Sequence, residues 1–334
     1  MLILGIETSC DDTSAAILRD ESVLANVVAS QDDVHEQYGG VVPELAARRH
    51  LENVDPVITA AMDQAGVGFD DLDLVAVTRG PGLVGSLLVG VSAAQGLGLG
   101  AGVPVFGVNH LEGHVLSPLL EETLPLPFLA LIVSGGHTAL YLVRDVGDYA
   151  EVSATRDDSA GEAFDKGAKM MGLGYPGGRL IDEMAKKGNA AAYRFPRGRV
   201  RADPLAMSFS GLKTALWEFL RREGEGADLN DVCASFQEAI VDVLRDRTVR
   251  AVEALDVKGV AVAGGVSANS RLRTVIGETC GELGVPHAFP SMRLCTDNAA
   301  MIAFVARERS LRGLPGDPLD AVSRLPLGPR LTLS

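Results

Sequence analysis

The chain has 334 residues, of which 47% are hydrophobic and 22% are charged. These values are typical of a soluble globular protein with two domains, or with one large domain of two lobes. The formal net charge of −14 excludes a protein that coats nucleic acid non-specifically, because such binding needs many cationic contacts to phosphate. A local basic patch is compatible with this charge. The four cysteines show no CxxC spacing, which favours a reduced cytoplasmic chain over a disulfide scaffold.

The first half of the chain alternates strand-like and helix-like segments. We expect it to open as a β-meander with acidic and hydroxyl residues in its first turn, and to continue as helix, strand, helix and strand. A glycine turn at 80–82 joins a strand directly to a helix. The expected strands are 1–8, 14–18, 23–30, 72–78 and 104–109, and the expected helices are 43–65 and 83–98.

One stretch in this half resembles a membrane span in composition. Gly80 to Leu111 contains no Asp, Glu, Lys or Arg, and it is long enough to cross a bilayer. Its many glycines, Pro104, and the polar Gln95 and Asn109 argue against a span. A buried helix followed by a buried strand explains the missing charges. The N-terminus also lacks the basic segment of a signal peptide, so we expect neither a signal peptide nor a membrane span.

The second half of the chain repeats this plan. Its expected strands are 128–133, 139–143, 149–155, 257–263 and 286–289, and its expected helices are 161–173, 179–187, 210–223, 228–255, 268–283 and 296–311. Strand–turn–strand units recur at 2–18 and 128–143, and strand–glycine turn–helix units recur at 72–95 and 257–283. The duplication predicts two similar α/β lobes with a cleft between them. We place the first lobe at 1–127 and the second at 128–334, the second with a helical insertion at about 156–255 and a C-terminal helix and tail.

Glycine or polar turns follow strands in both halves of the chain. Glycine turns expose backbone N–H groups, which favour phosphate where a helix begins. The same glycines can also serve only to allow tight turns. Four such turns in a duplicated fold favour phosphate binding; they lie at 9–13, 80–82, 134–138 and 264–267.

Two histidines, His110 and His114, follow the expected strand that ends at Asn109. On a helix this spacing puts both rings on one face, where they can reach one metal ion, although the same spacing also suits a polar groove. A zincin protease has the order His-Glu-x-x-His. Here Glu112 is displaced by one position, about 100° around a helix, so it points away from a metal bound by the pair. The sequence therefore argues against proteolysis.

Ten short motifs stand in order along the chain: GIETSCDDT at 5–13, YGGVVPELAAR at 38–48, GPGLVG at 80–85, NHLEGH at 109–114, VSGGHT at 133–138, GEAFDK at 161–166, YPGG at 175–178, SFSGLKT at 208–214, AGGVSAN at 263–269 and CTDNA at 295–299. Together they resemble the bacterial family of tRNA N6-adenosine threonylcarbamoyltransferases (TsaD), once described as O-sialoglycoprotein endopeptidases. The resemblance extends from residue 2 to about residue 305.

The resemblance implies a fold like that of actin, Hsp70 and sugar kinases, with two ribonuclease-H-like lobes. This agrees with the duplication. It also implies a reaction, in which a threonylcarbamoyl group passes from threonylcarbamoyl-adenylate to N6 of adenosine 37, in tRNAs that read codons starting with adenine. AMP is the leaving group. The implied enzyme is an acyltransferase of tRNA modification.

The resemblance also implies site residues. It assigns one divalent metal, iron(II) first and zinc as the alternative, to His110, His114 and Asp297. Because Asp297 belongs to the second half of the chain, we expect the metal to bridge the lobes. Asp11 is the implied catalytic acid–base residue, although an aspartate in a turn can also serve only the turn. The implied substrate-binding residues are Val133, Ser134, Gly135, Gly136, His137, Asp165, Gly178, Asp182 and Asn269.

Contact with tRNA requires local positive charge. The segment RFPRGRVR offers Arg194, Arg197, Arg199 and Arg201, and Arg48 and Arg49 form a second cluster that can equally be a solvated helix face. Lys166 and Lys213 are weaker candidates for phosphate contacts. The resemblance further implies a paralogous partner protein (TsaB), a small ATPase (TsaE), a separate synthase for the adenylate and a cytoplasmic location.

Three other functions fit parts of the sequence. The old endopeptidase assignment fails on the position of Glu112. A small-molecule kinase of the same fold normally holds Mg²⁺ with oxygen ligands, which two histidines do not supply. A non-catalytic scaffold would not need the full set of site residues. We therefore expect the acyltransferase.

Overall fold

The computed structural model describes residues 1–200 and 203–331, so Arg201 of the basic segment lies outside the described residues. The chain forms two compact units. The first unit contains Met1–Glu121 and Thr296–Leu327, and the second contains Glu122–Cys295 and Gly328–Ser334. The expected single division after residue 127 therefore differs from the observed grouping, because the segment after Cys295 returns to the first unit.

The first unit is built on a five-stranded mixed sheet in the order β3-β2-β1-β4-β5. The first three strands form the expected antiparallel meander, and β4 and β5 add in parallel beyond β1. Parallel strands buried on both faces read as continuous apolar runs, as Leu74–Val77 of β4 does. The strands are β1 (Leu2–Glu7), β2 (Asp12–Arg19), β3 (Ser22–Ser30), β4 (Leu74–Gly80) and β5 (Val105–Asn109).

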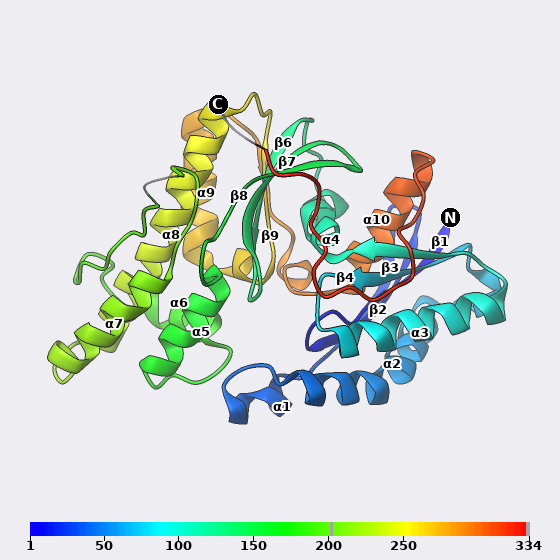
Figure 1. Cartoon of the computed structure of the whole chain (residues 1–334), viewed down its shortest axis with the longest axis horizontal. Helices are drawn as coiled ribbons and strands as arrows, with labels where there is room; N and C mark the ends of the chain where they lie inside the picture. The colour runs from blue at the N-terminus through cyan, green and yellow to red at the C-terminus, as the bar shows by residue number, and fades with distance from the viewer. Residues whose placement is uncertain (201–202, 332–334) are drawn as a thin grey trace. The chain divides into compact units, whose positions relative to one another are not determined.

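Helices cover both faces of this sheet. Figure 1 shows α2 and α3 on one side of the blue and cyan strands and α10 on the other. Gly5 of β1 allows α10 to lie close to the sheet, because a Cβ there would stand 2.3 Å from the carbonyl oxygen of Ala299. This packing draws the last helix into the first unit. The helices are α1 (Asp32–His35), α2 (Pro43–Ala65), α3 (Val84–Ala101), α4 (His110–Leu116) and α10 (Ala299–Leu311), with 3₁₀ turns at Glu36–Tyr38, Phe69–Asp71 and Ser117–Leu120.

Helix α3 is long and apolar enough to cross a membrane by length and composition, and 33% of its residues are buried. It packs against β4 and α2, and Leu87, Val91 and Ala94 enter or border the core. Leu88 and Leu99 are 50% and 87% exposed. A single apolar helix that packs on a sheet is weak support for a span, and the burial that we expected for this helix applies to one face only.

The second unit contains a five-stranded sheet in the order β10-β9-β6-β7-β8. Read from its other edge, this order matches that of the first unit strand for strand, with an antiparallel meander followed by two parallel strands. The predicted duplication of two α/β lobes is thus confirmed. The strands are β6 (Phe128–Val133), β7 (Thr138–Asp145), β8 (Asp148–Ala154), β9 (Val260–Ala263) and β10 (His287–Ala288).

In the described part of the second unit five helices accompany the sheet, and the long α8 fills much of the core through Phe236, Ile240 and Leu244 (Figure 1). Their positions follow the expected helices, with ends shifted by a few residues where capping side chains decide the boundary. Ser159 caps α5, for example, and Asn269 caps α9. The helices are α5 (Ala160–Met170), α6 (Gly177–Ala185), α7 (Ser210–Glu223), α8 (Leu229–Ala254) and α9 (Ser270–Leu283), with 3₁₀ turns at Gly265–Ala268 and Met292–Leu294.

Candidate functional site

The histidine pair begins a short helix at the carboxyl end of a parallel strand. Asn109 ends β5 and caps α4, because its side-chain oxygen accepts the backbone N–H of Leu111 at 2.9 Å. His110 and His114 then lie one turn apart, with ring centroids separated by 4.6 Å. Both rings are buried. The cap and the strand end therefore fix where the two imidazoles point.

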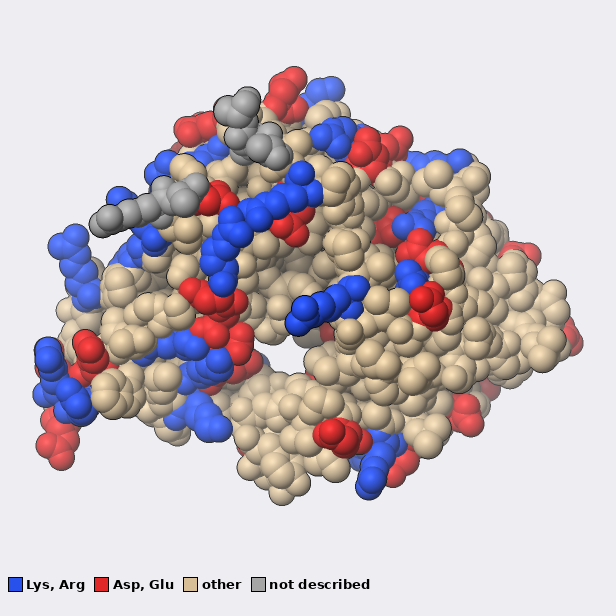
Figure 2. Space-filling view, in the orientation of Figure 1, with Lys and Arg blue, Asp and Glu red and all other residues tan. Residues whose placement is uncertain are grey.

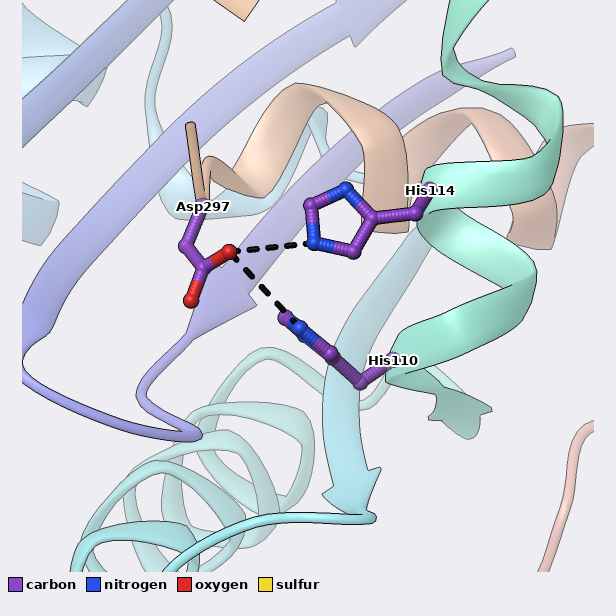
Figure 3. A group of neighbouring side chains, drawn as sticks. All are labelled: His110, His114 and Asp297. Carbon is purple, nitrogen blue, oxygen red and sulfur yellow. Dashed lines mark hydrogen bonds and ion pairs between the residues drawn. The ribbon is translucent and has the colours of Figure 1, made fainter. Parts of the chain in front are cut away.

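Asp297 completes a three-residue cluster with the histidines. Figure 3 shows both rings, carried by α4, directed at one carboxylate oxygen of Asp297. That oxygen lies 3.1 Å from Nε2 of His114 and 3.7 Å from Nε2 of His110. The N-cap of α10 is Asn298, since the Asn298 side chain accepts the N–H of Met301. Asp297 thus does not cap the helix and instead faces the histidines.

The donor set and its dimensions fit a divalent metal. One ligand atom from each of the three residues lies within 4.8 Å of the other two. Two ligands bound tetrahedrally at about 2.1 Å from an ion are separated by about 3.4 Å, which is close to the two observed contacts. Two imidazoles and one carboxylate suit iron or zinc and leave positions for a substrate. All three residues belong to the first unit, so the expected bridge between lobes is not made by these ligands.

Glu7, which the sequence analysis did not single out, supports the ring of His110. Its carboxylate is fully buried and lies 2.9 Å from Nδ1 of His110. It also accepts hydrogen bonds from the backbone N–H of Ser9 and from the hydroxyl of Thr78. A carboxylate on the far nitrogen of a ligating histidine fixes its tautomer and orientation. Glu7 therefore leaves Nε2 of His110 to face Asp297.

These charges shift one another's protonation. Burial opposes ionisation of both His110 and Glu7. Even so, the negative charges of Asp297 and Glu7 raise the pKa of His110 to about 9. The charge of His110 and its hydrogen bond hold the pKa of Glu7 below its usual value. At His114, Nδ1 is buried and has no hydrogen-bond partner in the described part of the chain. The two histidines are thus supported differently.

Asp11 lies in the turn between β1 and β2, in the same unit as the histidines. Burial raises its pKa, and Asp297 raises it further. The buried His50 of α2 holds this turn, with one ring nitrogen 3.0 Å from the carbonyl oxygen of Cys10 and the other 2.8 Å from the hydroxyl of Thr13. His50 was not predicted, because its role depends on contacts between α2 and a turn 40 residues earlier.

The predicted turn Val133–His137 follows the carboxyl end of β6 in the second unit. Its backbone closes on itself, with the N–H of Ser134 donating to the carbonyl of His137 at 2.8 Å. Gly161 of α5 packs directly on it, since a Cβ there would stand 2.6 Å from the carbonyl oxygen of Ser134. Gly135 and Gly136 remain exposed. The turn therefore presents glycine backbone beside the start of a helix.

The other predicted substrate-binding residues of the second unit meet at the starts of α6 and α9. Asp165 of α5 accepts the N–H of Gly177 at 2.8 Å, next to Gly178. Asp182 of α6 accepts the hydroxyl of Ser270 at 2.8 Å, which follows Asn269. The Asn269 amide donates to Gln237 of α8 at 2.7 Å. Each of these hydrogen bonds ties a predicted residue to another helix of the second unit.

Several of the predicted basic residues form ion pairs with acidic side chains. Arg197 donates to Asp242 at 2.6 and 2.8 Å, and Arg49 pairs with Glu52 at 3.0 Å. Lys166 and Lys213 both pair with Asp158. Arg48 is exposed. Figure 2 shows basic and acidic side chains intermixed on the surface.

The duplicated α/β plan is that of the actin-like and sugar-kinase-like fold. Solved structures of this class match the chain. They include the (R)-2-hydroxyglutaryl-CoA dehydratase component A of Acidaminococcus fermentans, with a TM-score of 0.56, 16% identity and coverage of 93% of this chain and 99% of that one. Full-length HypF matches with a TM-score of 0.60 and 13% identity over 92% of this chain and 46% of its own. At these identities the likeness concerns the fold alone.

Sequence comparison identifies the family to which the chain belongs. The model of the TsaD family, tRNA N6-adenosine threonylcarbamoyltransferase, matches residues 22–304. A relative of that name from Anaeromyxobacter sp. (strain Fw109-5) is 54% identical over 94% of this chain and 96% of its own. Another from Geotalea uraniireducens (strain Rf4) is 50% identical over 98% and 100%. The chain belongs to the tRNA N6-adenosine threonylcarbamoyltransferase family, as the ten motifs predicted.

Proposed function

We propose that this chain transfers the threonylcarbamoyl group of threonylcarbamoyl-adenylate to N6 of adenosine 37 in tRNAs that read codons starting with adenine. The family match across nearly the whole chain carries this proposal. In the reaction the amine nitrogen forms a bond to the carbamoyl carbon, the bond from that carbon to the phosphate oxygen breaks, and AMP leaves. The chain's residues have to hold the donor, orient the amine and accept one proton.

His110, His114 and Asp297 would hold one divalent metal, with iron(II) preferred and zinc as the alternative. The convergence of their ligand atoms supports this assignment. When bound, the ion would supply a Lewis acid that binds and polarises an oxygen of the donor. Metal analysis of His110→Ala protein tests the site, and a metal content equal to that of the wild type would reject it.

Asp11 would accept the proton that the amine loses. Its turn is held by His50, and its raised pKa suits a base that works near neutral pH. The variant Asp11→Asn keeps the shape of the side chain and removes the base. We expect it to bind tRNA normally and to lose transfer from pre-made adenylate. Full transfer by this variant would exclude the role.

The second unit would hold the adenylate. The exposed glycines of the turn Val133–His137 offer backbone N–H groups to phosphate. Asp165, Gly178, Asp182 and Asn269, brought together at the starts of α6 and α9, would contact the nucleoside. Binding of AMP to Gly136→Val protein tests the turn, and unchanged affinity would remove it from the site.

The tRNA would contact the basic segment of the second unit. A hollow of about 890 Å³ adjoins this segment at Val200, and Arg156, Arg250 and Arg330 are among its lining residues. Arg156 and Arg330 share one carboxylate, Asp203, and Glu253 also lines the hollow, so its three arginines outnumber its two acids. Reversing Arg199 to Glu should weaken tRNA binding and flatten its salt dependence, whereas Arg144→Glu on the β7–β8 hairpin should not. Equal effects of both changes would end this proposal.

A paralogous partner of the same fold and a small ATPase would assist the enzyme in the cytoplasm. Exposed apolar side chains in the first unit support a partner surface, since Leu51 of α2 and Leu88 and Leu99 of α3 are 70%, 50% and 87% exposed. Figure 2 shows few charged side chains over the α3 part of this face. We propose this surface, made by Leu51, Leu88 and Leu99, as the docking site of the paralogue.

The structure disfavours the two rival activities. Glu112 is bound by Arg309 and cannot act on a water at the histidines, as a protease would require. Two imidazoles are poor ligands for the Mg²⁺ of a kinase. Incubation of the chain with tRNA, threonine, bicarbonate, ATP, the synthase and the partner proteins, followed by nucleoside analysis, tests the proposal. Threonylcarbamoyladenosine is the expected product, and its absence would contradict the assignment.

A further inference from the structure

Glu112 lies between the two histidines on α4, but its side chain is directed at a different residue. Its carboxylate is fully buried, and Arg309 of α10 binds it through both oxygens. Nε of Arg309 lies 3.0 Å from one oxygen and Nη2 lies 2.6 Å from the other. Paired hydrogen bonds of this kind fix geometry as well as adding energy, because both planar groups must be aligned. The Arg309 side chain is itself 13% exposed.

The same two helices position the proposed metal ligands. His110 and His114 belong to α4, and Asp297 directly precedes Asn298, the N-cap of α10. Arg309 lies in the last turn of α10, about 16 Å further along at 1.5 Å per residue. The two histidines of α4 therefore face Asp297 at the start of α10, and Glu112 of α4 contacts Arg309 at the other end of α10.

Close packing connects these two points. A Cβ at Gly113 of α4 would stand 3.0 Å from side-chain atoms of Met301 and Ile302 in the first turns of α10. Arg309 is also held from its other side, because Nη1 donates to Asp317 at 2.9 Å and to the carbonyl of Pro315 at 3.3 Å. Neither sliding nor rotation of α10 against α4 can occur without breaking these contacts.

We propose that the Glu112–Arg309 ion pair sets the separation between the histidine nitrogens and Asp297, and so determines the affinity of the metal centre. The inference rests on the proposed metal site. Glu112 and Arg309 are positioning residues, since neither belongs to the three proposed ligands. Removing the pair should loosen the start of α10 against α4 and weaken metal binding without removing any ligand.

Arg309→Lys tests this inference, because it keeps the charge and loses the two-pronged contact. Arg307→Lys is the matched control. Arg307 lies on the same helix with the same 13% side-chain exposure, but it pairs with Glu21 and Glu308 and not with α4. Titration of each folded, chelator-treated protein with Co²⁺ and Zn²⁺ gives the affinity, and the Co²⁺ absorption spectrum reports the coordination geometry. Glu112→Gln provides a second variant, and circular dichroism confirms folding at the titration temperature.

We expect Arg309→Lys and Glu112→Gln to weaken Zn²⁺ binding roughly tenfold and to alter the Co²⁺ spectrum, as supporting residues of metal sites do. Arg307→Lys should stay within about twofold of the wild type. If His110→Ala loses the metal while Arg309→Lys and Glu112→Gln bind it like the Arg307→Lys control, the inference is overturned and the metal site stands. If His110→Ala binds the metal normally, both the site and the inference fail.

Discussion

Glu7 and Asp297 hold His110 from opposite sides of its ring. Glu7 lies at Nδ1 and Asp297 faces Nε2. The Glu7 carboxylate also accepts hydrogen bonds from Ser9, in the turn after β1, and from Thr78 of β4, and these bonds fix its orientation. Glu7, which orients the proposed ligand His110, thus belongs to the sheet.

This arrangement predicts the effect of Glu7→Gln. The amide keeps the size of the side chain but is a weaker acceptor for an imidazole N–H and can also present its NH₂ group. We expect metal affinity to fall about tenfold with all three ligands in place. Competition with a chromophoric chelator measures it. Glu52→Gln on the surface of α2 is the control, and equal affinities for the two variants would show that Glu7 does not support the site.

Asp12 gives the first unit a pH-dependent stability. Burial, together with the charges of Asp297, Asp11 and Asp32, raises its pKa from 3.8 to about 8, although Ser30 donates a hydrogen bond to it. Between these two values the folded protein binds the proton more tightly than the unfolded chain does. Stability should therefore fall as pH rises from about 4 to about 8, and this destabilisation should be absent below pH 3.8, where Asp12 is protonated in both states.

Asp12→Asn removes this titration. We expect the variant to be more stable than the wild type near pH 8, and the difference to vanish near pH 4. Urea midpoints of chelator-treated proteins across this range give the comparison. Asp20, an exposed aspartate paired with the N-terminus, serves as the control site through Asp20→Asn. A constant difference between Asp12→Asn and the wild type at all pH values would contradict the assigned pKa.

At the scale of elements, the contact between β1 and α10 places Asp297. The backbone N–H of Ala299 donates to the hydroxyl of Ser14 at 2.9 Å, and Gly5 leaves room for the Ala299 carbonyl. Two strands of the meander therefore hold the start of α10. Asp297, the third residue of the proposed metal site, thus owes its position to a glycine almost three hundred residues earlier in the chain.

Gly5→Ala should disturb this contact. A methyl group at 2.3 Å from a backbone oxygen forces α10 away from β1. We expect a loss of about 2–3 kcal/mol in the free energy of unfolding, together with weaker metal binding. Gly96→Ala in α3 is the control, because nothing lies within 4 Å of its Cβ and alanine favours a helix. Denaturant unfolding of both variants measures the difference, and similar stabilities would refute the packing argument.

The sequence predicted the strands and the longer helices, in order, because each half shows clear periodicity and glycine turns, whereas the short helix α1 was not predicted. It also predicted the His110–His114 pair, whose spacing is local. The spacing did not reveal Asp297, which came from the resemblance, and Glu7 and Arg309 were missed altogether. Their partners lie 103 and 197 positions away, and no local pattern encodes such contacts. The grouping of α10 with the first unit was missed for the same reason.

At the scale of the whole molecule, the two units carry different parts of the proposed chemistry. The first holds the His–His–Asp cluster and Asp11, and the second holds the glycine turn and the residues proposed for the nucleoside. Each unit has its own five-stranded sheet, and different polar residues follow the strand ends of each sheet. The proposed partner surface belongs to the first unit alone.

The partner surface yields a prediction for the assembled enzyme. Leu99→Asp should weaken association with the paralogous partner at least tenfold, since it places a charge in an apolar contact. Leu311→Asp is the control, because Leu311 is also exposed, at 62%, but lies at the end of α10. Sedimentation or light scattering of mixtures measures association. If both substitutions weaken association equally, or if neither weakens it, α3 is not part of the interface.

Single-turnover transfer tests the central claim most directly. Pre-made threonylcarbamoyl-adenylate and tRNA are mixed with the chain and its partners, with the chain native, stripped of metal by chelator, or stripped and reloaded with Fe²⁺ or Zn²⁺, and the modified nucleoside is quantified. The account predicts threonylcarbamoyladenosine with the native chain, loss of at least 90% on stripping and recovery on reloading, with no recovery in Asp297→Ala protein. Transfer by the stripped chain at the native rate, or no transfer by the native chain, would contradict it.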